Sequence, residues 1–279
     1  MSLNLDIIGQ KLAVEPFTYD RDTAILYALG VGAGVDELDF VYEKDLKVLP
    51  TFAVVPFIPS FMSVFVPKAG LNLFKVLHGE QSIVLHKPIA PSGTIHTSMV
   101  CESIYDKGDS GAIVNVCLES RNEAGELVFE NKAVIVDRGA GGFGGDRGPK
   151  TEKILPPEGK EPDFHIEQKT SEDQAALYRL SGDKNPLHID PGFAQKGGFD
   201  RPILHGLCSY GFAGRAILHG ACDSDPARLK SLSVRFMNVA YPGDTLITRG
   251  WKLDSHRFVI QTTNQDGKII LGNSLAVTK

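Results

Sequence analysis

The sequence contains few cysteines, and they lack the spacings that bind metals or build disulfide frameworks. Its 279 residues include four cysteines, at positions 101, 117, 208 and 222, and no Cys-x-x-Cys pair. In a chain of this length, four scattered thiols are typical of a protein from a reducing compartment. We therefore exclude a disulfide-stabilised extracellular scaffold and expect no metal site built on cysteine.

The sequence also lacks a basic face, a signal peptide and an unbroken apolar segment of membrane-spanning length. Its net charge is -5 and its lysines and arginines are spread along the chain, which argues against a nucleic-acid binder. The first residues contain no basic region followed by an apolar one. The uncharged segment 48–67 contains four prolines, which would break a spanning helix. We expect it to be buried, irregular or interrupted helical chain, without membrane insertion.

Glycine and proline, in contrast, are concentrated in one region. Six glycines lie between residues 139 and 148, and a run rich in Lys, Glu and Pro continues to residue 162. Such a stretch packs poorly and is typical of a linker. A phosphate-binding loop is disfavoured because no Gly-Lys-Ser or Gly-Lys-Thr follows. We predict an N-terminal half at 1–138, a linker at 139–162 and a C-terminal half at 163–279.

The two halves resemble each other. Residues 22–30 have apolar side chains at helical spacing, and residues 173–181 repeat the pattern, with Tyr178 at the position of Tyr27. The second copy begins with a Ser and a Gln, at 171 and 174, that have the spacing of a capping box. Each half ends in a strand-like hairpin, with turns at 122–125 and 264–267. The repetition predicts two duplicated α+β halves, each with a sheet and helical material on one face.

The densest cluster of candidate functional residues follows the second of these helices, at 181–190. An Asn-Pro pair at 185–186 forces a turn that can bring Asp183 and His188 together. A carboxylate and an imidazole that converge on one water are the groups needed to add or remove water by acid–base catalysis. The alternative is a helix cap followed by an Asx turn, with His188 a buried structural histidine.

A second pattern follows at residues 201–218. Pro202 and the spacing of the apolar residues predict a largely buried helix with His205 and Gly206 in its first turn. Free N–H groups at a helix start stabilise developing negative charge, and Gly206 would let a substrate carbonyl approach without a side chain in the way. The alternative is that the glycines of this helix serve only close packing.

Together the two segments resemble a known family. Residues 182–188 (Gly-Asp-Lys-Asn-Pro-Leu-His), followed by 201–206, look like the hydratase 2 motif of (R)-specific 2-enoyl-CoA hydratases, the MaoC-like dehydratases. In the first half, residues 77–81, 106–108 and 141–145 resemble the two-half enzymes of this family, including the hydratase 2 part of peroxisomal multifunctional enzyme type 2. The resemblance implies an α+β double hotdog, in which each half wraps an antiparallel sheet around a central helix and the two sheets pair.

The resemblance also implies a site and a reaction. Asp183 and His188 match the catalytic pair. Asn185 matches the polar residue that supports the pair, and Gly206 matches the backbone donor to the thioester carbonyl. The residues that match contacts to the CoA thioester are His78, Gly79, Lys107 and Phe236. The implied reaction is the reversible hydration of a trans-2-enoyl-CoA to a (3R)-3-hydroxyacyl-CoA in fatty acid metabolism, with CoA as part of the substrate and no cofactor.

The first half lacks these residues. Aligning the two tyrosines places 30–34 (Gly-Val-Gly-Ala-Gly) opposite 181–185, without Asp, Asn or His. We therefore predict one active site per chain. We also hypothesise that the proline-interrupted segment 51–65 leaves an apolar trough for the acyl tail, the alternative being that it packs as ordinary core. The rival functions are a hotdog acyl-CoA thioesterase and a non-catalytic acyl-CoA-binding subunit, and the intact motif disfavours both.

The expected partner is an acyl-CoA thioester rather than a nucleic acid, and analogy with other two-half hotdogs suggests a homodimer. His188 and Asp190, near His205, have no standard zinc spacing, so we expect no metal. The sequence ends at Lys279 without a Ser-Lys-Leu address, which leaves a cytoplasmic or a peroxisomal location open.

Overall fold

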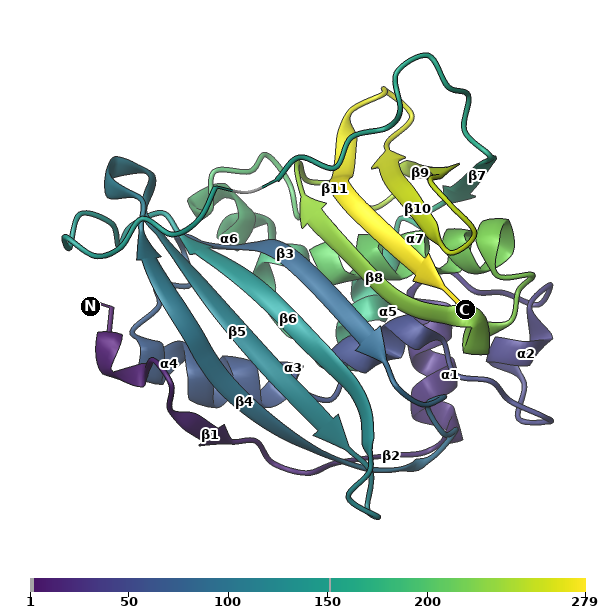
Figure 1. Cartoon of the computed structure of the whole chain (residues 1–279), viewed down its shortest axis with the longest axis horizontal. Helices are drawn as coiled ribbons and strands as arrows, with labels where there is room; N and C mark the ends of the chain where they lie inside the picture. The colour runs from purple at the N-terminus through teal and green to yellow at the C-terminus, as the bar shows by residue number, and fades with distance from the viewer. Residues whose placement is uncertain (1–2, 151) are drawn as a thin grey trace.

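One antiparallel sheet of 11 strands runs through the computed structural model, which describes residues 3–150 and 152–279 (Figure 1). Its strand order is β1-β4-β5-β6-β3-β8-β11-β10-β9-β7, and β2 also pairs with β4. The strands of the first half are β1 (Lys11–Ala13), β2 (Phe17–Tyr19), β3 (Val76–Leu85), β4 (Gly93–Asp106), β5 (Ala112–Arg121) and β6 (Leu127–Asp137). Those of the second half are β7 (Phe164–Lys169), β8 (Leu229–Phe236), β9 (Thr245–Lys252), β10 (Arg257–Thr263) and β11 (Ile269–Thr278). Both expected hairpins are confirmed, as β5–β6 and β10–β11.

The two halves join where β3 pairs with β8. Ile83 lies opposite Leu232 in this ladder, and both side chains are fully buried. Glu80 lies opposite Arg235, whose Nε donates a hydrogen bond of 2.8 Å to the Glu80 carboxylate. The ladder merges two sheets into one surface, as the pairing of two hotdog halves requires.

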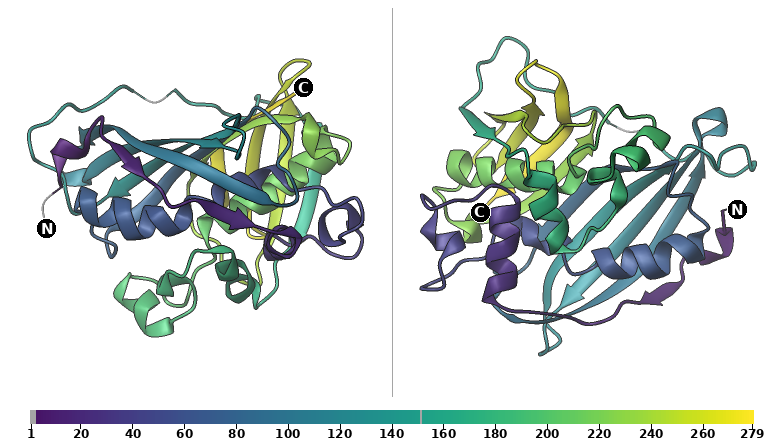
Figure 2. Two further views of the ribbon diagram at one scale, coloured as in Figure 1. Left: turned by 90° about the horizontal axis from the view of Figure 1, so that it is seen from below. Right: turned by 180° about the vertical axis from the view of Figure 1, so that it is seen from behind.

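Helices cover one face of this sheet in both halves (Figure 2). In the second half the central helix is α7 (Gly206–Ala221), which packs against β7, β8, β9 and β11. It begins at Gly206, so the expected start at Pro202 is wrong: Leu204 instead donates its N–H to the Ala240 carbonyl at 2.8 Å, which keeps this part of the chain extended.

The central helix of the first half is interrupted. It consists of a 3₁₀ turn (Pro50–Val54), α3 (Ile58–Ser60), a π turn (Phe61–Phe65) and α4 (Val66–Ala69). Its prolines at 50 and 59 stand in the first two positions of their turns, where a missing N–H leaves no bond unmade, whereas Pro67 directly follows the π turn within continuous helical chain. By length and composition alone this segment would pass as a membrane span, yet 61% of its apolar 18-residue window is buried inside the molecule. The expectation of buried, interrupted helical chain, and with it the α+β double hotdog, is confirmed.

The duplicated helices meet between the halves. They are α1 (Arg21–Gly30) and α5 (Gln174–Tyr178), and the rings of Tyr27 and Tyr178 lie 6.2 Å apart between centroids. Half of the expected capping box is present: the Ser171 N–H donates to the Gln174 side chain at 3.1 Å, but the Ser171 hydroxyl accepts from the Asp173 N–H instead of that of Gln174, where α5 begins. The same glutamine donates to the Gly30 carbonyl at 2.7 Å and so ties one copy to the other. The short helices α2 (Leu38–Val41) and α6 (Pro191–Lys196) complete the helical layer.

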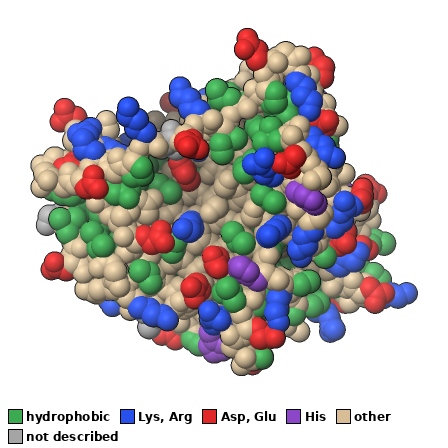
Figure 3. Space-filling model, in the orientation of Figure 1, with side chains coloured by type: hydrophobic (Ala, Val, Ile, Leu, Met, Phe, Trp, Pro, Cys, Tyr) green, Lys and Arg blue, Asp and Glu red, His purple; other side chains and the backbone are tan. Residues whose placement is uncertain are grey.

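The glycine-rich segment after β6 is more tightly held than its composition suggests. Both carboxylate oxygens of Asp106 accept backbone N–H groups, from Gly142 at 2.7 Å, Gly144 at 2.6 Å and Gly108 at 2.8 Å. These hydrogen bonds lower the pKa of Asp106 to about 2, and the one from Gly142 contributes most. Beyond this loop the chain crosses to β7 along the sheet (Figure 1). Acidic and basic side chains intermingle on the outer face (Figure 3), as the dispersed charge of the sequence indicates.

Candidate active site

A cavity of about 350 Å³ lies between the interrupted helix of the first half and the Asp-x-Asn-Pro-Leu-His segment of the second. Seven of the eight residues selected from the sequence line it, namely His78, Gly79, Asp183, Asn185, His188, Gly206 and Phe236. The interrupted helix contributes an apolar wall, made of Phe57, Ile58, Phe61, Met62 and Val66. Residues from both halves thus enclose one space.

The turn at 185–188 is built by Asn185. Its side-chain oxygen accepts the Leu187 N–H at 3.1 Å and caps the single 3₁₀ turn Pro186–His188. Asp183 makes a similar contact one step earlier, since its Oδ1 accepts the Asn185 N–H at 3.1 Å. The two side chains therefore shape the loop that carries them. Asn185 supports the pair by holding this turn. The Asx turn expected as the alternative is present, and it is the turn that brings the candidate catalytic side chains together.

The imidazole of His188 is held in one orientation. Its Nδ1 lies 2.9 Å from the Ile203 carbonyl oxygen, which can only accept, so Nδ1 carries the hydrogen and Nε2 keeps its lone pair. The side chain is buried, and this burial lowers the pKa of His188 below its usual value, although the nearby Asp183 opposes the shift. His188 is therefore neutral at pH 7 and can accept a proton.

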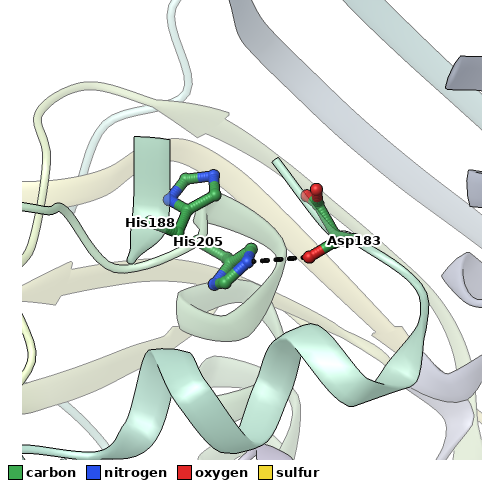
Figure 4. Close-up of side chains that lie close together, drawn as sticks. All are labelled: Asp183, His188 and His205. Carbon is green, nitrogen blue, oxygen red and sulfur yellow. Dashed lines mark hydrogen bonds between the residues drawn. The ribbon is translucent and has the colours of Figure 1, made fainter. Parts of the chain in front are cut away.

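Asp183 faces this imidazole across a narrow gap (Figure 4). A carboxylate oxygen of Asp183 and a ring nitrogen each of His188 and His205 all lie within 4.8 Å of one another. Two acceptors no more than 4.8 Å apart can both be reached by one water that donates a hydrogen to each. The arrangement matches the convergence of carboxylate and imidazole expected from the sequence.

His205 is the residue at this site that the sequence reasoning missed. Its ring stacks on that of His188, with centroids 3.7 Å apart and planes inclined by 28°. Its Nε2 donates to the backbone carbonyl of Asp183 at 3.2 Å, and its ring lies 4.9 Å from that of Tyr178 between centroids. Burial, and then the neighbouring His188, hold the pKa of His205 well below its usual value. The available signal was its place directly before Gly206.

The cluster of Asp183, His188 and His205 is compact enough to suggest a metal ion, but the chemistry of the donors is unsuitable. An imidazole binds a metal through a lone pair in its own plane. Two stacked rings direct these lone pairs along nearly parallel planes rather than toward one point.

Gly206 is the first residue of α7 and borders the cavity. Within the described residues its N–H has no acceptor in the protein, as expected for the first turn of a helix. A Cβ at this position would lie 3.2 Å from the ring of Phe236, which lines the same cavity. Glycine therefore keeps both the N–H and the space in front of it open.

The first half contributes a strand with an irregular register. Gly79 stands at a β-bulge, because the pairing with β6 shifts between His78 and Glu80. A Cβ on Gly79 would lie 3.2 Å from the Val134 carbonyl oxygen, so any other residue would require β6 to shift by a few tenths of an ångström. His78 packs on Phe236 with ring centroids 4.9 Å apart, and its buried Nε2 has no partner. Burial lowers the pKa of His78 to about 4.

Lys107 is the one selected residue that does not line the cavity. It lies in the turn after β4, and β5 and β6 separate that strand from β3 in the sheet. Its Nζ is directed at the Arg147 carbonyl and stands 5.7 Å from the centre of the Tyr105 ring. A contact from Lys107 to the thioester itself is not supported by this position, and a contact to a distant part of the substrate stays a prediction.

Two family models match the chain. Residues 17–139 match the MFE-2 hydratase 2 N-terminal domain, and residues 153–272 match the MaoC like domain. A Dictyostelium discoideum protein named probable enoyl-CoA hydratase 2 is 40% identical, and the match covers 97% of this chain and 95% of that protein. Mouse peroxisomal multifunctional enzyme type 2 is 42% identical over 96% of this chain, which spans only 37% of that enzyme. A MaoC-like dehydratase from Phytophthora capsici has a similar structure, with a TM-score of 0.88, 34% identity and 99% coverage of both chains.

Proposed function

Because the chain belongs to the family in which a hydratase 2 N-terminal domain precedes a MaoC-like domain, we infer that it is an enoyl-CoA hydratase of fatty acid metabolism. The observation that carries this function is the pairing of Asp183 with a neutral His188 beside the free N–H of Gly206 in one cavity. The reaction is the reversible addition of water to a trans-2-enoyl-CoA, and we propose the (3R)-3-hydroxyacyl-CoA as its product.

Gly206 supplies the electrophilic assistance. Its N–H donates a hydrogen bond to the thioester carbonyl, and the dipole of α7 adds positive potential at the same place. Both withdraw electrons from the conjugated double bond. C3 of the enoyl group becomes electrophilic, and the negative charge that develops on the carbonyl oxygen meets a donor already in place. A preorganised donor of this kind is worth on the order of 10²–10³ in rate.

Asp183 and His188 supply the water and the proton. Both present acceptor atoms to the gap between them, so both hydrogens of one water can be held while its oxygen faces C3. As the C3–O bond forms, the pair takes one proton from the water, and it returns one proton to C2, which has gained the electron pair of the double bond. Atoms balance without any redox change, so we propose that no metal or redox cofactor takes part.

The remaining cavity residues bind the substrate. The apolar wall of the interrupted helix, with Phe61 and Met62 at its π turn, receives the acyl tail. His78, Gly79 and Phe236 border the same cavity at the strand side, where they contact the CoA thioester. Neutral His78 packs on the ring of Phe236 at this side of the cavity.

The relatives also bear on the location and the assembly of the protein. The relatives named above include a peroxisomal enzyme, so we propose a peroxisomal or cytoplasmic location. The relation to multifunctional enzyme type 2 covers about a third of that protein, and its other activities are not assigned to this chain. A homodimer stays a prediction, to be measured by light scattering in solution.

One assay tests the function. The protein is incubated with crotonyl-CoA and with an enoyl-CoA of ten or more carbons, and the absorbance of the conjugated double bond and the free thiol are followed in parallel. A hydratase lowers the absorbance without releasing thiol, and chiral analysis of the product then reports the configuration at C3. Thiol release indicates a thioesterase, and no change in either signal indicates a binding subunit; both outcomes contradict the proposal.

A further inference from the structure

His205 contacts three parts of the site while lining none of the cavity. We propose that His205 is a positioning residue, which holds the Asp183 loop, the His188 ring and the Gly206 N–H in one arrangement. The inference rests on the proposed hydratase function for its effect on rate, and on the geometry alone for its effect on the site.

The first contact fixes the main chain of Asp183. The loop leaves helix α5 through Gly182, which has a positive φ of 119°. Beyond this turn, the Nε2–H of His205 donates to the Asp183 carbonyl at 3.2 Å. The donor comes from a segment 22 residues away in sequence, so the bond attaches the loop to the start of α7. An aliphatic side chain at 205 would leave that carbonyl without this partner.

The second contact limits the rotation of His188. The Ile203 carbonyl holds one edge of that ring at Nδ1, and the stacked His205 ring covers one face at 3.7 Å. A ring held at an edge and a face keeps its Nε2 in one direction. The stacking geometry needs a flat side chain, since an aliphatic group of similar volume has no plane to match.

The third connection is covalent. His205 is the N-cap of α7, with φ -58° and ψ 135°, and its carbonyl carbon shares a peptide plane with the Gly206 nitrogen. Anchoring the ring of His205 therefore also orients the N–H that faces the thioester carbonyl. One residue thus sets the position of the acid–base pair relative to the oxyanion donor.

A histidine in this place has a disadvantage that an apolar residue would avoid. It is 1% exposed, and its Nδ1 has no hydrogen-bond partner. Burying a polar atom without a partner destabilises the folded state, whereas a leucine would fill the space without this penalty. The cost in stability is a second sign that the ring is kept for the geometry of the site.

Three substitutions separate the contacts. His205→Leu removes both the N–H and the ring plane, His205→Phe keeps the plane, and His205→Gln keeps a side-chain N–H donor. Misplacing catalytic groups by about 1 Å costs about 10²-fold in rate, so we expect a kcat about 10² lower for Leu, with KM changed by less than about threefold. Phe and Gln should each recover part of the lost kcat. The control is Tyr210→Phe, which removes a buried hydrogen bond to Leu232 from the same helix without reaching the site.

Proton NMR of the His188 ring gives a readout that needs no turnover. Its ring-current shift, caused by the stacked neighbour, should persist in the Phe variant and disappear in the Leu variant. A Leu variant with the kcat or the His188 shift of the parent protein overturns the inference. So does a loss of kcat matched by Tyr210→Phe, because that result means general destabilisation. If the parent protein does not hydrate enoyl-CoA, the proposed function fails, and the NMR shift alone decides the positioning role.

Discussion

The two halves of the molecule carry corresponding loops. The loop of the second half borders an open cavity, whereas the space beside the loop of the first half is filled by side chains. Helices α1 and α5 correspond, with Tyr27 matching Tyr178, and a loop of similar length follows each helix. The residues of the first loop that correspond to Asp183, Asn185 and His188 are Gly32, Gly34 and Glu37. The first loop thus has neither the carboxylate nor the imidazole of the pair, and it has a carboxylate where the second has its histidine.

The space beside Glu37 is occupied by side chains of α7. Arg215 donates to the Val31 carbonyl at 3.0 Å and to the Glu37 carboxylate at 3.3 Å, and His219 lies 2.8 Å from the same carboxylate. Burial opposes ionisation of Glu37, but the hydrogen bonds from His219 and Arg215 lower its pKa overall. A Cβ on Gly32 would lie 2.5 Å from the ring of Phe212, so the position has no room for an aspartate.

The difference lies in the helix that faces each loop. The loop of the second half faces the interrupted helix, whose π turn and short segments leave the cavity open. The loop of the first half faces the regular helix α7, which places Phe212 and Arg215 one turn apart on the side toward it. A broken helix in one half and an intact one in the other therefore decide which loop can bind a substrate.

The largest expected effect comes from breaking the open site. Asp183→Asn keeps the shape of the loop but removes the carboxylate, so kcat should fall on the order of 10²–10⁴-fold, the usual loss for an acid–base group. The loop of the first half has no equivalent pair, so it should not supply any hydratase activity that replaces the lost one. Asp200→Asn, at an exposed carboxylate, is the control. Full hydration by the Asp183→Asn enzyme in the enoyl-CoA assay would refute the assignment.

The next effect comes from breaking the filled site. Arg215→Met removes the hydrogen bonds of the guanidinium to Val31 and to the half-buried carboxylate of Glu37, which should lower the free energy of unfolding by about 3 kcal/mol. The cavity does not contain Arg215, so kcat of the folded variant should stay within about twofold of the parent value. Urea unfolding followed by tryptophan fluorescence measures the first quantity. The double variant Glu37→Gln with Arg215→Met should recover part of the loss; a single variant as stable as the parent would show that the ion pair is dispensable.

The local parts of this comparison could be predicted from the sequence, and the non-local parts could not. The repeat around Tyr27 and Tyr178, the hairpin turns and the Asn185 turn each depend on neighbouring residues, and the structure has them. The ion pair between Glu37 and Arg215 joins residues 178 positions apart, and no pattern along the chain connects them.

The remaining differences have the same physical origin. The start of α7 was misplaced because a strand-like hydrogen bond from Leu204 to Ala240 overrides the local preference after Pro202. The stacking of His205 on His188 depends on the fold around both rings. The residues of the site were therefore readable from a motif, whereas the contacts that orient them required the packed structure.

A smaller effect concerns a residue that the first half contributes to the open site. The pKa of His78 is about 4 in the folded chain, against 6.5 for a free histidine. The unfolded chain therefore binds a proton between these values that the folded chain does not, so stability is fully present above pH 6.5 and falls as the pH drops toward 4. The loss in the free energy of unfolding caused by His78 reaches about 3 kcal/mol by pH 4. His78→Phe should flatten this part of the curve of unfolding free energy against pH, and a curve parallel to the parent's would contradict the buried, neutral state.

The smallest effect tests whether the interrupted helix is a binding surface or only a gap in the packing. Met62 lies at the π turn and lines the cavity, whereas its neighbour Ser63 is exposed. Met62→Trp should fill the acyl end of the cavity and lower kcat/KM about tenfold for an enoyl-CoA of ten or more carbons, since overpacking by a few methylene volumes costs about 1–3 kcal/mol. We expect the four-carbon acyl group of crotonyl-CoA to end short of this wall, so its kcat/KM should not change, and Ser63→Trp should affect neither substrate. An equal loss on both substrates would mean that the tryptophan disturbs the catalytic pair instead. Rejection of the long substrate by the parent enzyme would remove the acyl trough altogether, and the interrupted helix would then be no more than core.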